Sequence, residues 1–456
     1  MDMQSLVASQ RAFFCTGATL DLSFRQAALN TLEQAIRAGE GELLAALKTD
    51  LNKSAAEGYL CEVGLVLSEL SYLKRHLPRW ARTRRMPTPL TQFPAKSYIF
   101  RDPYGVVLMM SPWNYPLLLA LDPLIGAMAA GNCCVVKPSA YAPASSAALR
   151  DLLSRCFPPE YVAVVEGGRQ ENQALLDQKF DYIFFTGGVD VGRQVMEKAA
   201  RHLTPVTLEL GGKSPCVVDG SAKLDLAAKR LVFGKLLNCG QTCVAPDYLL
   251  IDRRVKQAFL DRVKHWMAAM YGRDPLDNDG YVRMVNSRHF DRVRALIDPA
   301  KVVYGGGSDP NTLKIQPTIL DGVSSDDPVM GEEIFGPLLP VLEFEDIHEA
   351  ETFILNRPRP LALYLFTEDR QVQRQFSRSL SFGGGCVNDT VLHLANPRLP
   401  FGGVGESGMG SYHGKRSFDT FSREKSVVCA STRLDPPVRY APYTPAKERL
   451  IRRFLK

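Results

Sequence analysis

Apolar side chains recur every three or four residues through the first part of the chain. Between residues 20 and 80 this period is carried by Leu29, Leu32, Ile36, Leu43, Leu44, Leu47, Leu65, Leu70 and Leu73. Side chains at this spacing lie on one face of a helix, which can be buried while the other faces stay in water. We therefore predict that residues 20–80 are mostly helical.

From Gly105 onward the pattern changes to short apolar runs separated by helical stretches. The runs lie at residues 106–110, 133–136, 161–165, 182–185, 217–218, 248–251 and 302–303, and the series continues to about Val391. Strands that are apolar on both faces and alternate with helices are typical of a parallel sheet covered on both sides. The predicted fold class is therefore α/β, with two successive sheets. Residues 97–101 form a further strand candidate.

Length and composition agree with a folded protein of two or three domains. The 456 residues are 45% hydrophobic and 23% charged, which excludes disordered, collagen-like and disulfide-scaffold classes. The ten cysteines are irregularly spaced and include no Cys-x-x-Cys pair. We expect free thiols in a reducing, cytoplasmic compartment.

The net charge of +6 is concentrated near the end of the chain. Residues 431–456 carry seven basic and two acidic side chains, so the remainder is close to neutral. This distribution excludes nucleic acid as a partner, because such a partner requires basic residues spread over a folded face. In the tail, Leu450, Ile451, Phe454 and Leu455 form an apolar stripe beside basic residues. Two interpretations stay open: an exposed or dimer-docked helix, and a membrane contact with anionic lipid.

Neither a secretory leader nor a membrane span is expected. Residues 1–14 lack a basic segment followed by an apolar block. The longest uncharged stretch, residues 104–121, contains Pro112, Asn114 and Pro116. A bilayer would leave this backbone unsatisfied, so we expect the stretch to lie inside the protein.

Three residues are candidates for catalysis. Cys243 lies in Asn238-Cys-Gly-Gln-Thr-Cys-Val-Ala-Pro246, where a small, polar approach would let substrate reach the sulfur; the alternative is a structural core thiol. Glu209 lies in an apolar strand before Gly211-Gly212, where burial would raise its pKa toward that of a general base; the alternative is a capping or ion-paired residue. Asn114, held between two prolines, could stabilise an oxyanion; the alternative is a plain turn.

A glycine turn follows the apolar run at residues 182–185. Thr186, Gly187, Gly188 and Gly192 lead from a strand into a helix, whose N-terminus could approach a phosphate. The spacing is not Gly-x-Gly-x-x-Gly. No His-Glu-x-x-His, P-loop or Gly-x-Ser-x-Gly signature is present, and Cys239 has no second ligand pair, so no metal site is expected.

Taken together, these segments resemble the aldehyde dehydrogenase superfamily, and in particular its class 3 branch for fatty and aromatic aldehydes. The motifs that carry the resemblance are Pro112-Trp-Asn-Tyr-Pro116, Lys137-Pro-Ser139, Phe185-Thr-Gly-Gly188, Glu209-Leu-Gly-Gly-Lys-Ser-Pro215, Gly240-Gln-Thr-Cys243, Glu332-Glu-Ile-Phe-Gly-Pro337, Leu399-Pro-Phe-Gly-Gly-Val-Gly405, Ser407-Gly-Met-Gly410 and Tyr412-His-Gly-Lys415. They occur in family order over nearly the whole chain.

The resemblance implies a role for each candidate. Cys243 would be the nucleophile that forms a thiohemiacetal and then a thioester, Asn114 an oxyanion donor, and Glu209 the base for thioester hydrolysis. The cofactor would contact Lys137, Thr186, Gly187, Gly188, Gly192, Glu333 and Phe335. Tyr115, Leu119 and Leu237 would line the substrate entrance. The substrate would be a medium- or long-chain aliphatic aldehyde, or an aromatic one.

The identity of the cofactor, NAD or NADP, stays open. Many relatives carry an acidic residue three positions after the lysine, where it pairs with the ribose 2′-hydroxyl, but this chain has Ala140. Without an acidic side chain at this position, a 2′-phosphate is not repelled, which favours NADP. Asp190, near the predicted start of the helix, would disfavour phosphate charge there and therefore argues the other way, for NAD.

The resemblance also implies a division into domains and a homodimer. Residues 1–80 and 102–208 would form a Rossmann-like cofactor domain, residues 209–394 the catalytic domain, and residues 81–101 with 395–430 a β element that bridges subunits. Residues 431–456 would be a basic tail. The alternatives are a CoA-acylating aldehyde dehydrogenase or acyl reductase on the same fold, against which Glu209 argues, and a non-catalytic structural protein, against which the presence of all three candidates argues.

Overall fold

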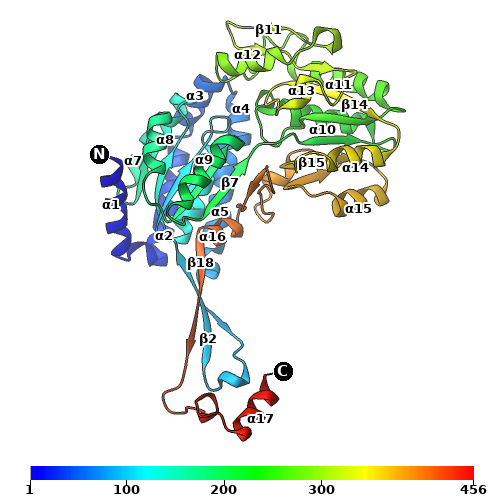
Figure 1. The fold of residues 1–456 in the computed structure, drawn as a ribbon. Coiled ribbons are helices and arrows are strands. Elements are labelled where there is room, and N and C mark those ends of the chain that lie inside the picture. The colour runs from blue at the N-terminus through cyan, green and yellow to red at the C-terminus, as the bar shows by residue number, and fades with distance from the viewer. Residues whose placement is uncertain (1, 456) are drawn as a thin grey trace.

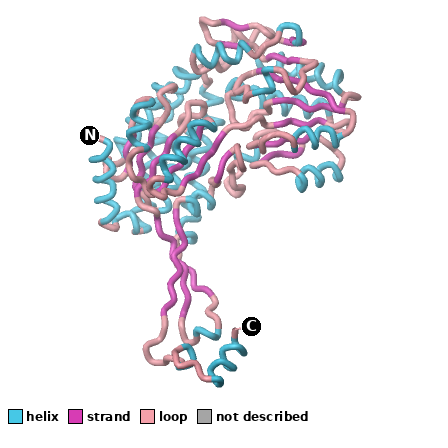
Figure 2. Tube along the Cα trace, in the orientation of Figure 1, coloured by secondary structure: helices cyan, strands magenta, loops and turns pink. Residues whose placement is uncertain are grey.

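Two α/β bodies and a narrow arm make up the computed structural model, which describes residues 2–455. The bodies lie side by side, and the arm extends away from the first of them (Figure 1). A six-stranded sheet, a seven-stranded sheet and a three-stranded sheet account for these parts (Figure 2). The predicted α/β class is confirmed.

Helices precede the first sheet, as the period of the leucines predicts. They are α1 (Met3–Cys15), α2 (Leu22–Ala38), α3 (Glu40–Leu51), α4 (Ala55–Gly58) and α5 (Gly64–Trp80). The periodic residues Leu29, Leu32 and Ile36 are fully buried. A π-helical segment at Tyr59–Val63, which the period does not predict, joins α4 to α5.

The first sheet has the strand order β17-β7-β6-β3-β4-β5. Its strands and helices are β3 (Val106–Met110), α6 (Leu118–Ala130), β4 (Cys133–Lys137), α7 (Pro143–Cys156), β5 (Val162–Val164), α8 (Arg169–Leu176), β6 (Tyr182–Gly187), α9 (Val189–Ala200) and β7 (Val206–Leu210). These strands pair in parallel, and the short β17 (Gly408–Met409) adds an antiparallel edge beside Leu208 and Glu209.

The second sheet has the order β10-β13-β14-β9-β8-β15-β16, parallel except for β10. Its elements are β8 (Pro215–Val218), α10 (Leu224–Leu236), β9 (Tyr248–Asp252), α11 (Lys256–Tyr271), α12 (Ser287–Ala295), β10 (Val302–Tyr304), β13 (Thr318–Leu320), α13 (Pro328–Gly331), β14 (Leu338–Phe344), α14 (Ile347–Leu355), β15 (Ala362–Phe366), α15 (Arg370–Ser379) and β16 (Gly384–Val387). A small hairpin, β11 (Ser308–Asp309) and β12 (Lys314–Ile315), lies apart from it.

The arm is an antiparallel sheet of β1 (Arg84–Met86), β2 (Lys96–Pro103) and β18 (Ser422–Cys429). The glycine-rich return that precedes β18 does not belong to the arm as a whole. Its β17 joins the first sheet, and α16 (Lys415–Thr420) packs against α6. The helix α17 (Pro445–Phe454) lies at the far end of the arm (Figure 1).

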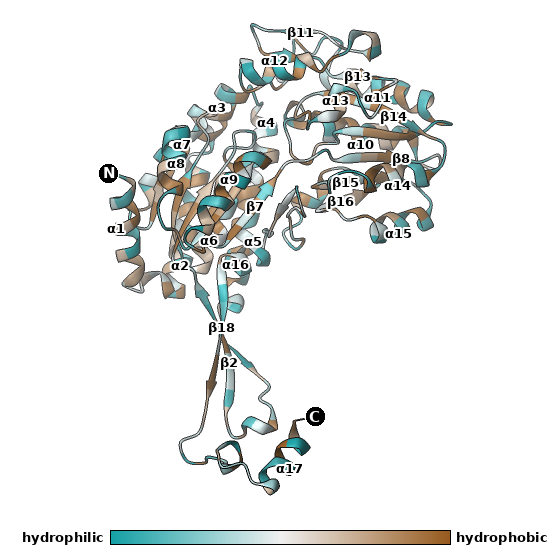
Figure 3. Cartoon of the chain, in the orientation of Figure 1, coloured by the Kyte–Doolittle hydropathy of each residue, from teal (hydrophilic) through white to brown (hydrophobic). Residues whose placement is uncertain are grey.

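Hydropathy follows burial in both bodies. Figure 3 shows the central strands coloured as hydrophobic and the outward helices with hydrophilic faces. All five residues of β3, β4, β9 and β15 are buried. This burial explains why these strands read as continuous apolar runs.

Candidate active site

Cys243 follows a turn with unusual backbone geometry. After α10, Asn238, Cys239 and Gly240 all have positive φ (53°, 55° and 72°). A Cβ on Gly240 would lie 2.3 Å from the carbonyl oxygen of Gly336, so only glycine fits this position. The turn presents Cys243 to a cavity between the two bodies, where its side chain is partly accessible.

Asn114 is hydrogen bonded to the same segment. Its side chain is 2% exposed, and Nδ2 donates to the carbonyl oxygen of Gln241 at 3.0 Å. The carbonyl oxygen of Asn114 in turn accepts from Nδ2 of Asn238 at 2.8 Å. The structure therefore brings the Asn114 amide to the chain segment that holds Cys243.

Glu209 is a buried carboxyl group at the end of β7. It is 2% exposed, and neither oxygen has a hydrogen-bond partner within residues 2–455. Burial raises the pKa of Glu209 well above its usual range. Burial also raises the pKa of Cys243, with smaller contributions from the charges of Glu333 and Glu209, so the three groups lie in one electrostatic environment.

Glu333 faces the first body from the loop after α13. A Cβ on Gly211 would lie 2.1 Å from Oε2 of Glu333, so the glycine makes room for this carboxyl group. Oε1 has no partner among the described residues, and burial raises the pKa of Glu333 to about 8. Nearby, Phe335 has a φ of 50° and packs edge-on against Trp113 at 5.4 Å between ring centroids.

The predicted glycine turn leads from β6 into α9. The hydroxyl of Thr186 is buried without a partner within residues 2–455, and no atom lies within 4 Å of where a Cβ on Gly188 would be. A Cβ on Gly192 would lie 2.6 Å from Leu210, so this glycine allows the helix to approach the sheet closely. The turn leaves the N-terminus of α9 open to a phosphate group.

Lys137 lies at the end of the neighbouring strand β4. Its Nζ donates to the carbonyl oxygens of Pro138 and Gly167, each at 2.7 Å, which leaves one of its three N–H groups for a ligand. Burial lowers the pKa of Lys137 to about 8. Ala140 lies exposed on the following turn, and the Asp190 side chain is 90% exposed and paired with Arg193 at 3.1 Å. Solvation weakens the argument that Asp190 repels phosphate charge.

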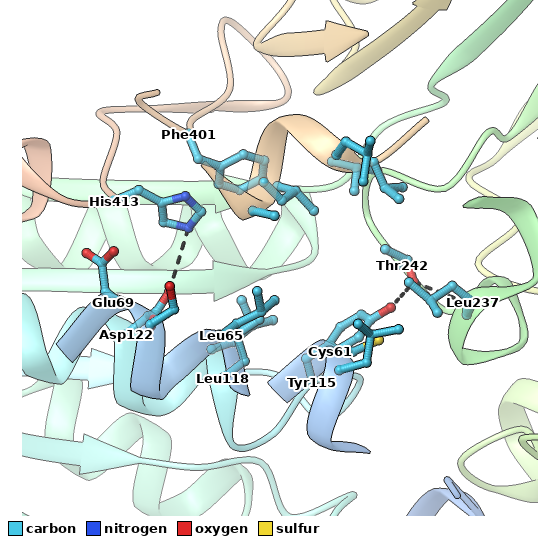
Figure 4. A pocket seen from close by; sticks show the side chains of 18 of the residues that line it. Cys61, Leu65, Glu69, Tyr115, Leu118, Asp122, Leu237, Thr242, Phe401 and His413 are labelled. Carbon is cyan, nitrogen blue, oxygen red and sulfur yellow. Dashed lines mark hydrogen bonds and ion pairs between the residues drawn. The ribbon is translucent and has the colours of Figure 1, made fainter. Parts of the chain in front are cut away.

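Figure 4 shows the cavity that Cys243 faces. It has a volume of about 190 Å³, and Tyr115, Leu119 and Leu237 line it together with other apolar side chains. The hydroxyl of Tyr115 is hydrogen bonded to that of Thr242 at 2.7 Å. A polar group of Glu69, Asp122 and His413 also lines the cavity, at the side away from Thr242 (Figure 4).

Two features of this region were missed by the sequence analysis. A fully buried ion pair, Lys53 to Glu62 at 2.6 Å, supports the Asn114 loop, because Glu62 also accepts from the backbone N–H of Leu117 at 2.9 Å. No pattern in the sequence marks this pair. The polar group had one signal, the charged Asp122 within an otherwise apolar helix.

The basic tail has few contacts with the two bodies. The helix α17 has no buried residue, and Leu450, Phe454 and Leu455 are exposed. Across residues 2–455, no helix is both long enough and apolar enough to cross a membrane.

Comparisons with known proteins agree on one family. The model of the aldehyde dehydrogenase family matches residues 1–427. The 4,4'-diaponeurosporen-aldehyde dehydrogenase of Staphylococcus aureus is 47% identical over 98% of this chain and 97% of that protein. Aldehyde dehydrogenase family 3 member H1 of Arabidopsis thaliana is 46% identical over 99% and 94%.

Solved structures give the same result. The substrate-bound state of Staphylococcus aureus AldH superposes with a TM-score of 0.98 at 45% identity, covering 100% of both chains. An indole-3-acetaldehyde dehydrogenase of P. syringae in complex with NAD+ superposes with a TM-score of 0.86 at 27% identity, covering 94% of this chain and 89% of that one.

Proposed function

Because the chain belongs to the aldehyde dehydrogenase family, we propose that Cys243, Glu209 and Asn114 are the catalytic residues of its aldehyde-oxidising site. The protein is an NAD(P)-dependent enzyme of the class 3 branch. The observation that carries the assignment is the position of Cys243, which opens into an apolar cavity and shares its electrostatic environment with two buried carboxyl groups.

In the first step the Cys243 thiol loses its proton to solvent and the resulting thiolate attacks the aldehyde carbon. The C=O π bond breaks, and the carbonyl oxygen gains negative charge in the thiohemiacetal. The Asn114 amide and the backbone N–H of Cys243 donate to this oxygen. The amide is held in place in advance by its hydrogen bond to Gln241. Donors that need no rearrangement stabilise developing charge most effectively.

The residues around the cofactor turn fit a nicotinamide dinucleotide. The unpartnered Thr186 hydroxyl, the unpartnered Oε1 of Glu333 and the open space at Gly188 supply donors, acceptors and room for one. We assign Lys137, Gly187, Gly192 and Phe335 to the same site. When bound there, the cofactor would supply the hydride acceptor, and loss of hydride from the thiohemiacetal carbon would leave a thioester on Cys243.

Glu209 completes the cycle as the general base. Its carboxylate takes a proton from water, and the resulting hydroxide attacks the thioester carbon. The C–S bond then breaks to release the acid, and the Cys243 thiolate takes the proton back from Glu209. The raised pKa of Glu209 suits this role, since a stronger base accepts the proton more readily. A CoA-acylating enzyme would not need this base.

The substrate we propose is a medium- or long-chain aliphatic aldehyde, or an aromatic one. The support is the apolar wall that Tyr115, Leu119 and Leu237 contribute to the cavity. The named relatives act on a diaponeurosporen-aldehyde and on indole-3-acetaldehyde, both largely apolar.

The test is reduction of NAD and NADP by purified protein with alkanals of increasing length and with benzaldehyde. Cys243→Ala should abolish both dehydrogenase and esterase turnover, whereas Cys15→Ala, at an exposed cysteine, should retain them. Wild-type turnover in Cys243→Ala would contradict the assignment, whereas a lack of turnover in the unaltered protein with every aldehyde would favour a non-catalytic protein. Formation of an acyl-CoA thioester instead of the acid, when CoA is added, would favour the acylating alternative.

The larger organisation is also part of the proposal. We assign residues 1–80 and 102–208 to cofactor binding, residues 209–394 to catalysis, residues 81–101 and 395–430 to a bridging element that acts through β2 and β18, and residues 431–456 to a basic tail. The extended arm, with Val428 53% exposed, supports a homodimer (Figure 2). Ten free cysteines support a cytoplasmic compartment. We assign the tail to an exposed or dimer-docked helix in preference to a lipid contact.

A further inference from the structure

The substrate cavity has a polar group at one side of its apolar wall. Glu69 comes from α5, Asp122 from α6 and His413 from the glycine-rich return. The side chains of Asp122 and His413 point toward each other, and Glu69 lies beside them (Figure 4). Leu65 and Leu118 lie between this group and the hydrogen-bonded pair of Tyr115 and Thr242. Thr242 directly precedes Cys243 in the sequence. The polar group is therefore separated from the reaction centre by apolar surface.

Two members of the group have structural partners. Oε1 of Glu69 accepts from the backbone N–H of Gly414 at 2.6 Å, which ties α5 to the return segment. The ring of His413 stacks on that of Phe401 at 5.4 Å. These contacts hold both side chains in place without any ligand.

No comparable contact explains the buried carboxyl group of Asp122. It is 5% exposed, and its Oδ1 has no hydrogen-bond partner anywhere in residues 2–455. Its Oδ2 lies 3.7 Å from Nε2 of His413, beyond the usual length of a hydrogen bond. A buried carboxyl oxygen without a partner costs free energy, so its presence in the cavity wall calls for a function.

The charge of the group favours a neutral ligand. Burial raises the pKa of Asp122 well above its usual range and that of Glu69 to about 7, and it lowers the pKa of His413 to about 4. No lysine or arginine forms an ion pair with either carboxyl group in the described part of the chain. A protonated Asp122 donates one hydrogen bond and accepts another, which is the pattern that a hydroxyl group matches. An ammonium group would require Asp122 to ionise in an apolar surrounding.

We propose that Asp122 determines specificity by binding a hydroxyl group at the far end of the aldehyde chain. This inference rests on the proposed function, because it assumes that the aldehyde carbon lies at Cys243. Asp122 follows Leu118 by one helical turn, a rise of about 6 Å. Leu118 itself lies between Asp122 and the Tyr115–Thr242 pair beside the reaction centre. The hydroxyl group must therefore lie several carbon atoms beyond the carbonyl.

The test compares ω-hydroxyaldehydes with the matching n-alkanals, from about six to about twelve carbons, since this range covers one to two helical turns. At one chain length we expect kcat/KM for the hydroxyaldehyde to exceed that for the alkanal about tenfold, as one added buried hydrogen bond allows. The matching ω-aminoaldehyde should show no such gain. A gain for the amine instead of the hydroxyl would overturn the proposal.

Three variants separate recognition from a structural role. Asp122→Leu should remove the hydroxyl preference, whereas Asp122→Asn, which still donates and accepts, should retain most of it. Asp261→Leu, a matched change at an exposed site on α11, should keep the wild-type ratio. The ratio of the two kcat/KM values is the readout, so an equal loss for both substrates in Asp122→Leu would contradict recognition.

Failure of this proposal is distinguishable from failure of the proposed function. If alkanals are oxidised and no hydroxyaldehyde is preferred at any length, Asp122 does not bind the substrate and only the inference is wrong. If no aldehyde is oxidised, both are wrong.

Discussion

At the scale of single residues, the buried carboxyl group of Glu209 allows a sharp test of the second half-reaction. Glu209→Gln keeps the size of the side chain but removes its basicity, so the thioester should form and then persist. We expect one equivalent of NAD(P)H in a rapid burst, followed by a steady state slower by about 10²–10⁴-fold. Stopped-flow absorbance measures both phases. Glu197→Gln, at an exposed position, is the control, and an unaltered steady state in Glu209→Gln would mean that another base serves.

The same side chain should make stability depend on pH. Burial raises the pKa of Glu209 in the folded chain, so its contribution is most favourable at low pH and is lost as the pH rises through the raised pKa. The glutamine in Glu209→Gln does not ionise. The variant's Tm should therefore exceed that of the wild type by a margin that grows with pH. Thermal denaturation at about pH 5, 7 and 9 checks the trend, which a constant difference would refute.

Candidate site residues could be identified from the sequence only where short motifs contain them. Cys243, Glu209 and Asn114 lie in distinctive segments, and the structure brings their neighbourhoods together. The Lys53–Glu62 ion pair and the unpartnered Asp122 could not be predicted in the same way. Their significance comes from burial and from neighbours distant in sequence, which a linear pattern does not contain.

At the scale of elements, two glycines of the turn between β6 and α9 should respond differently to alanine. Gly188→Ala adds a methyl group in open space, so Tm should hold or rise slightly, while KM for the cofactor rises because the phosphate approach is narrowed. Gly192→Ala places a Cβ 2.6 Å from Leu210 and should cost about 1–3 kcal/mol of stability. Differential scanning fluorimetry and cofactor titration separate the two. A large loss of stability in Gly188→Ala would contradict this division.

The turn after β4 offers a test of cofactor choice. Ala140 is exposed there, three residues beyond Lys137. A carboxylate at this position would accept from a ribose 2′-hydroxyl and repel a 2′-phosphate, so Ala140→Glu should raise the ratio of kcat/KM for NAD to that for NADP. Ala140→Gln, which lacks the charge, should shift the ratio less. Identical ratios in the wild type and both variants would disprove the ribose argument.

Elements were predictable where one local period decides them. The run at residues 106–110 coincides with β3, because a strand buried on both faces is apolar throughout. The π-helical segment at Tyr59–Val63 and the antiparallel β17 were not predicted. Both make contacts with distant parts of the chain: Gly408 of β17 pairs with Glu209, and Glu62 of the π-helical segment accepts from the backbone N–H of Leu117.

At the scale of the whole molecule, the glycine-rich return connects three parts of the structure: the first sheet, the cavity wall and the arm. It contributes β17 beside Glu209, places His413 in the cavity wall and continues into β18 of the arm. A displacement of the arm could therefore alter the wall of the cavity, because one short segment belongs to both. The sequence predicted the return as a unit but not its division between sheet, cavity and arm.

The arm should hold two copies of the chain together. Its sheet ends in the unpaired outer edge of β18, where Val428 is 53% exposed, and Leu434 beyond it is 52% exposed. Exposed apolar side chains on a protruding edge favour a partner surface. Light scattering should therefore give a mass about twice 50.5 kDa. Lysine at both positions should shift the protein toward monomer, whereas Leu203→Lys, at a 91% exposed leucine on the first body, should not. A monomeric wild type, or a dimer unaffected by both arm lysines, would contradict this role of the arm.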